Sequence, residues 1–156
     1  MTTANFKNYF SGSSTQYGKY RPQYPKGLFK YLASVSPDND KAWDCACGTG
    51  QSSLGLNEHF KEVVATDASE NQIVKAIKKP GITYQISPAE KTQIANEEID
   101  LITVAQALHW FNIESFFKEA DRVLKKNGIL AVWTYNLLEI NEILDKIISD
   151  LYNETL

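Results

Sequence analysis

The residues best placed to bind a ligand lie in the run Trp43-Asp44-Cys45-Ala46-Cys47-Gly48-Thr49-Gly50, where an apolar strand leads into a glycine-containing loop. The spacing of apolar residues after this run predicts a helix from Gln51 to Phe60. In open α/β sheets, ligands bind beyond the carboxyl end of such a strand, against the N-terminus of the following helix. Gly48 and Gly50 carry no Cβ, so the backbone can turn sharply and a ligand can approach closely. The run therefore predicts a ligand-binding loop.

A second carboxylate ends the next expected strand, Glu62 to Asp67. Asp67 is placed to accept hydrogen bonds from both hydroxyls of an adenosine ribose, as acidic residues do in nucleoside-binding βαβ units. The dinucleotide fingerprint requires a third glycine at the position of Ser53, so a pyrophosphate ligand and a nicotinamide-dependent oxidoreductase are disfavoured. An ordinary strand–turn–helix without a ligand is the alternative.

The loop resembles motif I of class I S-adenosylmethionine-dependent methyltransferases, often written D-x-G-C-G-T-G, with Ala46 where the family usually has glycine. This departure is expected to tighten the turn. The resemblance implies S-adenosylmethionine as the cofactor, bound by the loop and by the residues that end the second strand. The implied cofactor-binding residues in these two places are Asp44, Cys47, Gly48, Thr49, Gly50, Asp67 and Ala68.

The N-terminal pattern Y-x-x-Y-R-P-x-Y-P, from Tyr17 to Pro25, resembles the entry of methyltransferases that act on small carboxylic acids. These form the trans-aconitate methyltransferase-like group of methyltransferase type 11. The resemblance implies that the segment closes over the methionine end of the cofactor. Arg21 would pair with the amino-acid carboxylate, and Tyr17 or Tyr20 would lie near the sulfonium. A surface arginine beside tyrosines that cover the sheet is the alternative.

Ser87-Pro88-Ala89-Glu90 is similar to the segment that follows the third strand in this family. The resemblance implies that Ala89 or its backbone meets the edge of the adenine ring. Glu90 would cap or orient the loop. Plain turn chemistry explains the same residues nearly as well.

The stretch from Asp100 to Phe111 is similar to the fourth strand of the family and the loop after it. The resemblance implies that the backbone of Gln106 and Ala107 faces the methionine amino group and that Trp110 walls the pocket. His109 would lie at the entrance to the methyl group, as the candidate catalytic base for a hydroxyl or amine acceptor. Core packing of the His109–Trp110 pair is the alternative.

Strands and helices alternate along the chain in the order needed to position these residues. Strands are expected at the Trp43 run, 62–67, 82–87, 99–105 and 129–135, and helices at 25–36, 51–60, 69–79, 113–126 and from 139. Ser69 with Gln72 predicts a capping box, Asn112 a helix N-cap, and Asn127-Gly128 the end of a helix. The alternation indicates an α/β fold with a doubly wound, mainly parallel, Rossmann-like sheet.

The resemblance covers only the cofactor-binding front of a class I domain, which has seven strands in the order 3-2-1-4-5-7-6. We therefore expect one domain over 1–156, the N-terminal portion of a longer domain, truncated after the fifth strand and its helix. Its parts would be an N-terminal cap and helix over 1–37, a five-stranded core over 42–135 and an amphipathic helix over 139–156. The fifth strand would form an apolar edge that requires a cover. A naturally short form, covered by a partner or by a second copy in a homodimer, is the alternative.

Composition narrows the class of protein. The 156 residues are 43% hydrophobic and 22% charged, as in ordinary globular chains. A net charge of −3 without a basic stripe argues against a nucleic-acid partner, and no apolar run has the length of a membrane span. Residues 1–6 lack a signal-peptide core, so we expect a cytoplasmic protein. Cys45 and Cys47 are expected to be buried thiols on one strand face, without a metal site.

The sequence therefore predicts methyl transfer from S-adenosylmethionine to a small-molecule acceptor. The trans-aconitate-like resemblance points to a carboxylic acid, which needs no general base. The alternative is a non-catalytic S-adenosylmethionine-binding fragment or pseudoenzyme that pairs with another chain.

Overall fold

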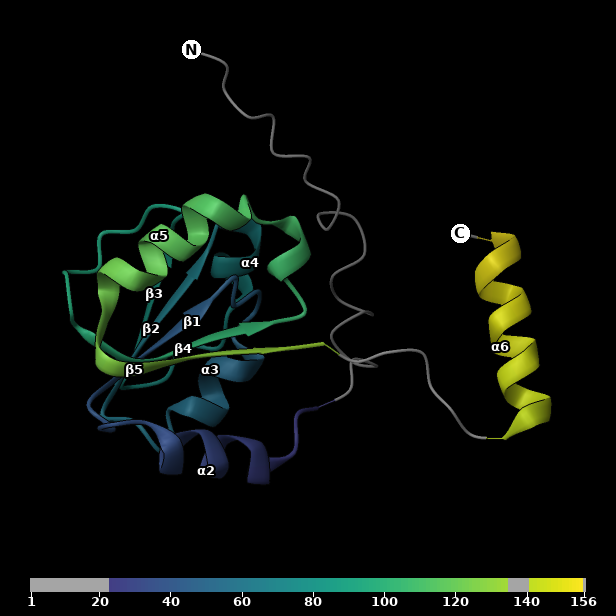
Figure 1. Ribbon diagram of the computed structural model, residues 1–156, viewed down its shortest axis with the longest axis horizontal. Coiled ribbons are helices and arrows are strands. Elements are labelled where there is room, and N and C mark those ends of the chain that lie inside the picture. The colour runs from purple at the N-terminus through teal and green to yellow at the C-terminus, as the bar shows by residue number, and fades with distance from the viewer. Residues whose placement is uncertain (1–22, 135–140, 156) are drawn as a thin grey trace, which may run out of the picture.

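The computed structural model describes residues 23–134 and 141–155. Within these ranges, five parallel strands form one sheet in the order β3-β2-β1-β4-β5 (Figure 1). The strands are β1 (Lys41–Cys45), β2 (Glu62–Asp67), β3 (Ile82–Ile86), β4 (Ile99–Ala105) and β5 (Leu124–Trp133). The helices are α2 (Lys26–Val35), α3 (Gln51–Leu56), α4 (Glu70–Lys75), α5 (Ile113–Val123) and α6 (Glu142–Thr155), and η1 (Leu108–Trp110) is a 3-10 turn. The arrangement confirms the predicted doubly wound α/β sheet.

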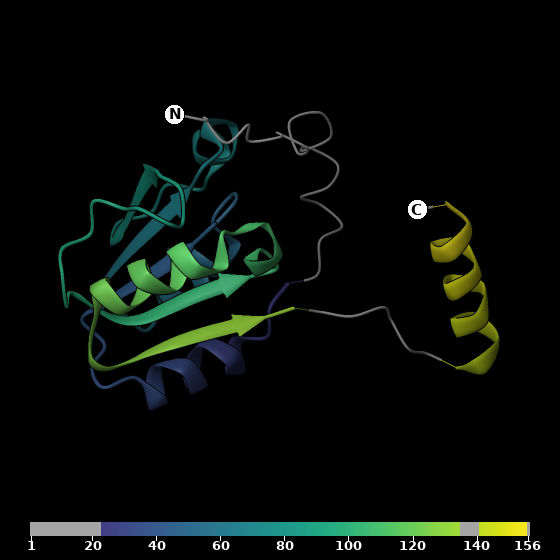
Figure 2. The same cartoon turned by 45° about the horizontal axis from the view of Figure 1, so that its top comes forward.

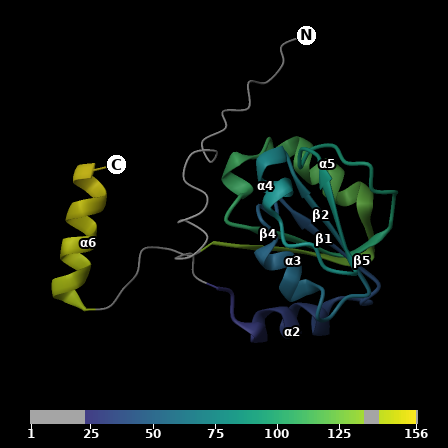
Figure 3. The ribbon, with the colours of Figure 1, turned by 180° about the vertical axis from the view of Figure 1, so that it is seen from behind.

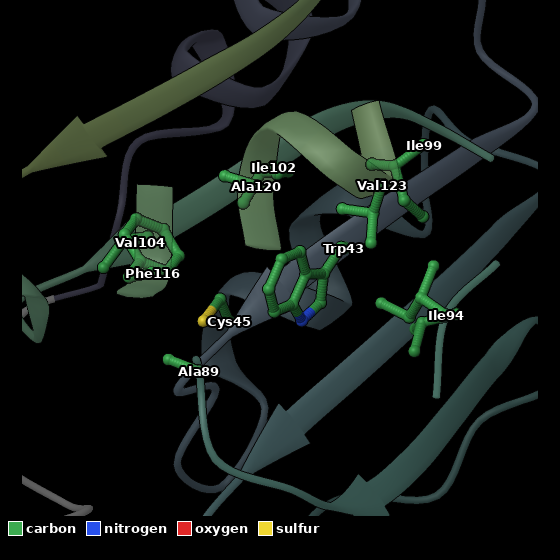
Figure 4. Packing of buried hydrophobic residues seen from close by; sticks show 11 residues of the cluster. Trp43, Cys45, Ala89, Ile94, Ile99, Ile102, Val104, Phe116, Ala120 and Val123 are labelled. Atoms are coloured by element: carbon green, nitrogen blue, oxygen red, sulfur yellow. The ribbon is translucent and has the colours of Figure 1, made fainter. Parts of the chain in front are cut away.

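Helices cover both faces of the sheet, with α5 on one face and α2 and α3 on the other (Figures 2 and 3). On the α5 face, Trp43 packs in a buried cluster that includes Phe116 and Val123 (Figure 4). On the opposite face, Phe29 of α2 and Leu56 of α3 belong to a second buried cluster. Strands buried on both faces carry apolar runs rather than alternating patterns, which is why β1, β2 and β4 could be located from the sequence.

The direction of the chain across the sheet reverses between β1 and β4. From β1 the chain moves outward to β2 and β3, and it then returns to pair β4 with the other side of β1. Cys45 accordingly pairs with Thr66 on one side and with Val104 on the other. Open α/β sheets bind ligands at the carboxyl ends of the strands beside such a reversal. The fold therefore places the ends of β2, β1 and β4 at one potential binding edge.

The sequence predicted the boundaries of some strands correctly and the end of α5 wrongly. β2 and β4 begin and end at the predicted residues, and Asn112 caps α5 as expected. The predicted end of α5 at 126 was wrong, because Leu124 is already extended and pairs with Ile99 of β4. Asn127-Gly128 therefore lies inside β5 instead of ending the helix. Asn127 has a φ of 66°, within the part of β5 where the register shifts between Ile99 and Leu101.

Helix ends and one side-chain orientation near the loop also differ from the predictions. α3 ends at Leu56 and α4 at Lys75, short of the expected 60 and 79. Cys45 and Cys47 are free, buried thiols, as predicted. They do not share a face, because Ala46 turns the chain between them with a φ of 55° and the two thiols pack in different clusters.

α6 is the amphipathic helix expected at the end of the chain, beginning at Glu142 rather than 139. Its apolar residues Ile143, Leu144 and Ile147 are 76%, 41% and 58% exposed. No helix in the described ranges combines the length and the apolar character needed to cross a membrane.

Candidate functional site

The loop after β1 has an unusual backbone. Ala46, Gly48 and Gly50 have φ angles of 55°, 56° and 88°, so alternate residues occupy the left-handed region. A Cβ on Gly50 would collide with the Tyr84 hydroxyl, which leaves glycine as the residue that fits there. Ala46 adopts the same kind of conformation at a strain of about 1 kcal/mol. Strain of this kind persists where the surrounding structure enforces it, often at ligand sites.

Asp44 lies beneath this loop and is 1% exposed. Its Oδ2 accepts a hydrogen bond from the Ser53 hydroxyl at 2.5 Å, and its Oδ1 accepts one from the Thr103 hydroxyl at 3.1 Å. Burial raises the pKa of Asp44 to about 6, although the hydroxyl donors oppose the change. Asp44 therefore connects β1 to α3 and β4, and it holds a negative charge beside the loop at neutral pH.

Asp67 connects the end of β2 to the same loop. Its Oδ2 accepts a hydrogen bond from the Gly48 N–H at 2.8 Å, and its Oδ1 accepts one from the Ser69 N–H at 2.8 Å. Ser69 occupies the N-cap of α4, but its side chain makes no cap bond, so the predicted capping box is wrong. Burial raises the pKa of Asp67, whereas the two N–H donors lower it. A carboxylate has about four lone-pair sites, so Asp67 keeps capacity for ribose hydroxyls.

A second strained residue lies where the chain leaves β4. Gln106 has a φ of 60°, and its N–H donates to the Trp133 carbonyl at 3.0 Å. Its Oε1 accepts a hydrogen bond from the Thr134 hydroxyl at 2.9 Å. Ala107, the next predicted residue, is half-buried. The structure thus holds the end of β4 in a fixed conformation beside the β1 loop.

A small, partly open cavity lies at this edge of the sheet, between the β1 loop and the end of β4. Its lining residues are Tyr24, Asp44, Ala46, Cys47, Gln51, Ser52 and Ala105. Within the described part of the chain, the buried Ser52 hydroxyl makes no hydrogen bond of good geometry, although it lies near enough to Asp44 to help lower the pKa of that carboxyl. A polar group without a well-formed hydrogen bond on a cavity wall fits a site that binds a polar ligand.

His109 and Trp110 lie on η1, just after Ala107, and both are exposed. Trp110 is 55% exposed, and the centroids of the two rings are 4.8 Å apart. The alternative of core packing for this pair is therefore wrong. Exposed rings at the carboxyl end of a central strand are available to a ligand, and His109 is available to exchange a proton with one.

Ala89 and Glu90 differ in what they offer to a ligand. The Ala89 methyl is 7% exposed and packs in the cluster around Trp43, so its side chain belongs to the core. Glu90 Oε1 accepts a hydrogen bond from the Asn112 N–H at 2.8 Å, which ties the β3–β4 connection to the start of α5. The expected loop-orienting contact of Glu90 is present.

The remaining predicted cofactor-binding residues differ in how far they are buried. The Cys47 side chain is buried, which raises the pKa of its thiol, and its N–H donates to the Thr66 carbonyl at 2.9 Å. Thr49 is half-buried and Ala68 is exposed. Tyr20 and Arg21 lie outside the described residues. Among the described His, Cys, Asp and Glu side chains, no group of three or more could hold a metal ion.

Sequence reasoning missed the residues that support the site. Ser53 and Thr103 donate to Asp44, and Tyr24 and Trp133 stack edge-on beside the cavity at 5.4 Å between ring centroids. In the sequence, Ser53 stands out only as the position where the dinucleotide fingerprint requires a glycine. Its hydroxyl, at the third residue of the helix that follows Asp44 and the glycine loop, was the available signal.

Comparisons with known proteins agree on one family. A family model described as a methyltransferase domain matches residues 43–132. A Dictyostelium discoideum protein named as a methyltransferase is 38% identical over 140 residues, which are 89% of this chain and 53% of that protein. A Saccharomyces cerevisiae protein named as an S-adenosylmethionine-dependent methyltransferase is 30% identical over 131 residues, 78% of this chain and 45% of that protein.

A solved structure shows the same similarity. The structure of a type II methyltransferase from Anaeromyxobacter dehalogenans is 40% identical and has a TM-score of 0.80, over 86% of this chain and 57% of that one. This chain spans about half the length of the curated relatives it matches.

Proposed function

This chain belongs to the methyltransferase-domain family, of the class I S-adenosylmethionine-dependent type, and we propose that it binds S-adenosylmethionine at the carboxyl ends of β2, β1 and β4. The observation that carries the proposal is the hydrogen bond that the Gly48 N–H donates to Asp67 Oδ2 at 2.8 Å. That contact holds an acidic residue with spare acceptor capacity against a glycine loop, at the edge where the strand order reverses.

The residues present fit this cofactor. Asp67 would accept the ribose hydroxyls, and the backbone of Gln106 and Ala107 would meet the methionine amino group. Asp44 adds a negative charge on the same cavity wall as the Ser52 hydroxyl, and this charge suits an ammonium group. Tyr20 and Arg21 are proposed to close over the methionine end, as the family resemblance implies.

We propose that the reaction is methyl transfer to a small acceptor. When bound, S-adenosylmethionine would supply an electrophilic methyl group that can bond to an acceptor lone pair, with a neutral thioether as the leaving group that keeps the carbon–sulfur electron pair. The loop residues and Asp67 fix the position of the donor, and Trp110 walls the acceptor side. Alignment of this kind can supply roughly 7–11 kcal/mol.

The acceptor class decides whether the chain must move a proton. The proposed acceptor is a small carboxylic acid, in line with the trans-aconitate-like resemblance, and its carboxylate needs no base. For a hydroxyl or amine acceptor, His109 is the proposed base, because it is exposed at the end of β4.

Calorimetric titration with S-adenosylhomocysteine tests the cofactor proposal. Wild type should bind in the micromolar range, about −8 kcal/mol. Asp67→Ala and Asp67→Asn should both weaken binding, and Asp67→Asn keeps an acceptor for one of the two backbone N–H groups, so that it separates binding from folding. Asp121→Asn, on the exposed side of α5, is the matched control. A folded Asp67→Asn variant with wild-type affinity would remove the basis of the proposal.

A second candidate is a non-catalytic cofactor-binding unit that pairs with another chain or with a second copy. β5 is an edge strand among the described residues, and its Val132 is 43% exposed. The apolar face of α6 is exposed as well. Sedimentation of residues 1–156, together with turnover compared against a longer form, distinguishes the candidates. A monomer that turns over as fast as the longer form would exclude the second.

A further inference from the structure

Two polar groups at the ends of β4 and β5 are buried without a hydrogen-bond partner in the described part of the chain. They are Trp133 Nε1 and Gln106 Nε2. An indole N–H can only donate, and an amide nitrogen carries two donors. Buried donors are almost always paired in folded proteins, so an unpaired one requires an explanation. The buried indole of Trp43 follows the rule, because its Nε1 donates to Thr66 Oγ1 at 2.9 Å.

The two donor residues are neighbours. Trp133 pairs in register with Ala105, and the N–H of the next residue, Gln106, donates to the Trp133 carbonyl at 3.0 Å. Gln106 is held in its left-handed conformation with φ of 60°, while its Oε1 accepts from Thr134. The fold thus holds Gln106 in a left-handed conformation with its amide nitrogen unused, and joins its backbone to that of Trp133, whose indole N–H is also unused.

Both donor residues adjoin residues that line the cavity described above. Tyr24 lines that cavity, and its ring packs edge-on against the Trp133 ring, with an interplanar angle of 86°. Ala105, which also lines the cavity, precedes Gln106. On the β1 side of the same cavity lies Asp44, an acceptor that would repel an anion. The edge therefore offers an acceptor over β1 and donors over β4 and β5.

We propose that Trp133 Nε1 and Gln106 Nε2 together form a carboxylate-binding subsite on the β5 side of the cavity. Donors on this side and a carboxylate on the other match the two ends of an amino-acid zwitterion. The carboxylate has two possible sources, the methionine end of the cofactor or the methyl acceptor. The inference rests on the proposed function, since it assigns a further part of the same site.

Nuclear magnetic resonance of the indole N–H groups gives a direct test. The chain has three tryptophans, and Trp133→Phe identifies the Trp133 signal while keeping an aromatic ring against Tyr24. The probes are S-adenosylhomocysteine, 5′-methylthioadenosine, which lacks the amino-acid end, and succinate added with and without S-adenosylhomocysteine. Calorimetry of wild type, Trp133→Phe and Gln106→Ala with the same probes measures affinity.

If the cofactor supplies the carboxylate, S-adenosylhomocysteine shifts the Trp133 signal and 5′-methylthioadenosine does not. Trp133→Phe then weakens S-adenosylhomocysteine about tenfold or more and leaves 5′-methylthioadenosine unchanged. If the acceptor supplies it, succinate shifts the signal in the S-adenosylhomocysteine complex, and both nucleosides bind the variants as they bind wild type.

Failure of this inference is distinguishable from failure of the proposed function. A Trp133 signal that no probe moves overturns the subsite, while shifts of other residues with S-adenosylhomocysteine leave the proposed function intact. If neither nucleoside binds wild type, the proposed cofactor is wrong. Succinate alone then decides whether Trp133 and Gln106 bind a carboxylate.

Discussion

Replacing Asp44 with asparagine is expected to raise the free energy of unfolding at neutral pH. Burial raises the pKa of Asp44 from its ordinary 3.8 to about 6 in the folded protein. The folded state therefore binds this proton more tightly than the unfolded state. The free energy of unfolding then decreases as pH rises from about 4 to about 6, and this contribution is level above that window. The difference corresponds to about 3 kcal/mol.

The geometry favours this substitution. Asp44 accepts hydrogen bonds from the hydroxyls of Ser53 and Thr103, and hydroxyl groups can both donate and accept. The oxygen and the amide of asparagine can therefore each meet one hydroxyl, without a cavity or an unpaired group. The variant loses the buried charge and keeps the connection between β1, α3 and β4.

Urea denaturation of wild type and Asp44→Asn at several pH values between about 4 and 7.5 provides the assay. The two proteins should have similar stability near pH 4, and the variant should be more stable by up to about 3 kcal/mol near pH 7.5. Asp67, whose pKa is also raised, gives both proteins a shared slope of the same sign. Asp121→Asn, an exposed control, should change stability by no more than about 0.5 kcal/mol.

Two results would refute the reasoning. A difference between wild type and Asp44→Asn that is constant with pH would mean that Asp44 does not titrate as a buried group. A variant less stable than wild type near pH 7.5 would mean that the ionised form is favoured by its surroundings. Under the proposed function, the gain in stability should come with weaker S-adenosylhomocysteine binding, because the charge serves the cofactor's ammonium group.

Further substitutions test the packing of α2 on α3 and an ion pair on α5. Gly55→Ala should lower the free energy of unfolding by about 1–3 kcal/mol, because its Cβ would collide with the Phe29 ring. Gly27→Ala should instead raise the free energy of unfolding by about 0.5–1 kcal/mol, because no atom lies within 4 Å of its Cβ and alanine favours the helix. Urea denaturation compares the two, and equal stabilities would contradict the packing of α2 on α3. Glu119→Gln should cost about 2 kcal/mol at pH 7, because Arg122 pairs with Glu119 at 2.7 Å and holds the pKa of that carboxyl at about 2. The loss should shrink as pH falls from 4.5 toward 2, and a loss that is the same in acid would exclude the ion pair as its cause.

Much of the fold was predictable because its central strands are apolar on both faces. Glu62–Asp67 and Ile99–Ala105 were located to the residue from such runs between turn signals. The end of α5 was not predictable in the same way. Asn127-Gly128 carries a genuine signal for a left-handed residue, and Asn127 has a φ of 66°. This signal does not specify whether a helix ends there or a strand changes register. Because Leu124 pairs with Ile99 of β4, the segment forms a strand, and Asn127 lies at its change of register.

In the candidate site, too, some residues could be predicted from the sequence and others could not. Asp44 and Asp67 were placed by their local context, at the ends of strands beside a glycine loop. Their partners come from elsewhere in the chain, such as the Thr103 hydroxyl, which meets Asp44 from 59 positions away. The unpaired Trp133 N–H depends on the pairing of β5 with β4, and no local pattern encodes it.

The two edges of the sheet differ in how they satisfy their polar groups, and this difference predicts how substitutions act. At the amino ends of the strands, Lys41 contacts both Glu62 and Glu98, at 2.8 Å and 2.6 Å, and Lys125 pairs with the buried Asp100 at 2.8 Å. The carboxyl ends instead carry carboxyl groups with raised pKa, at Asp44 and Asp67, and buried donors without a partner among the described residues.

Charge removal at the amino edge should therefore lower stability without affecting cofactor affinity, since these charges pair with one another within the protein. Removal of the Asp44 charge at the carboxyl edge should instead lower affinity while leaving stability equal or higher, because burial opposes that charge and the proposed ligand uses it. An amino-edge variant such as Lys125→Met that stays folded yet loses S-adenosylhomocysteine binding would show that this separation between the edges is wrong.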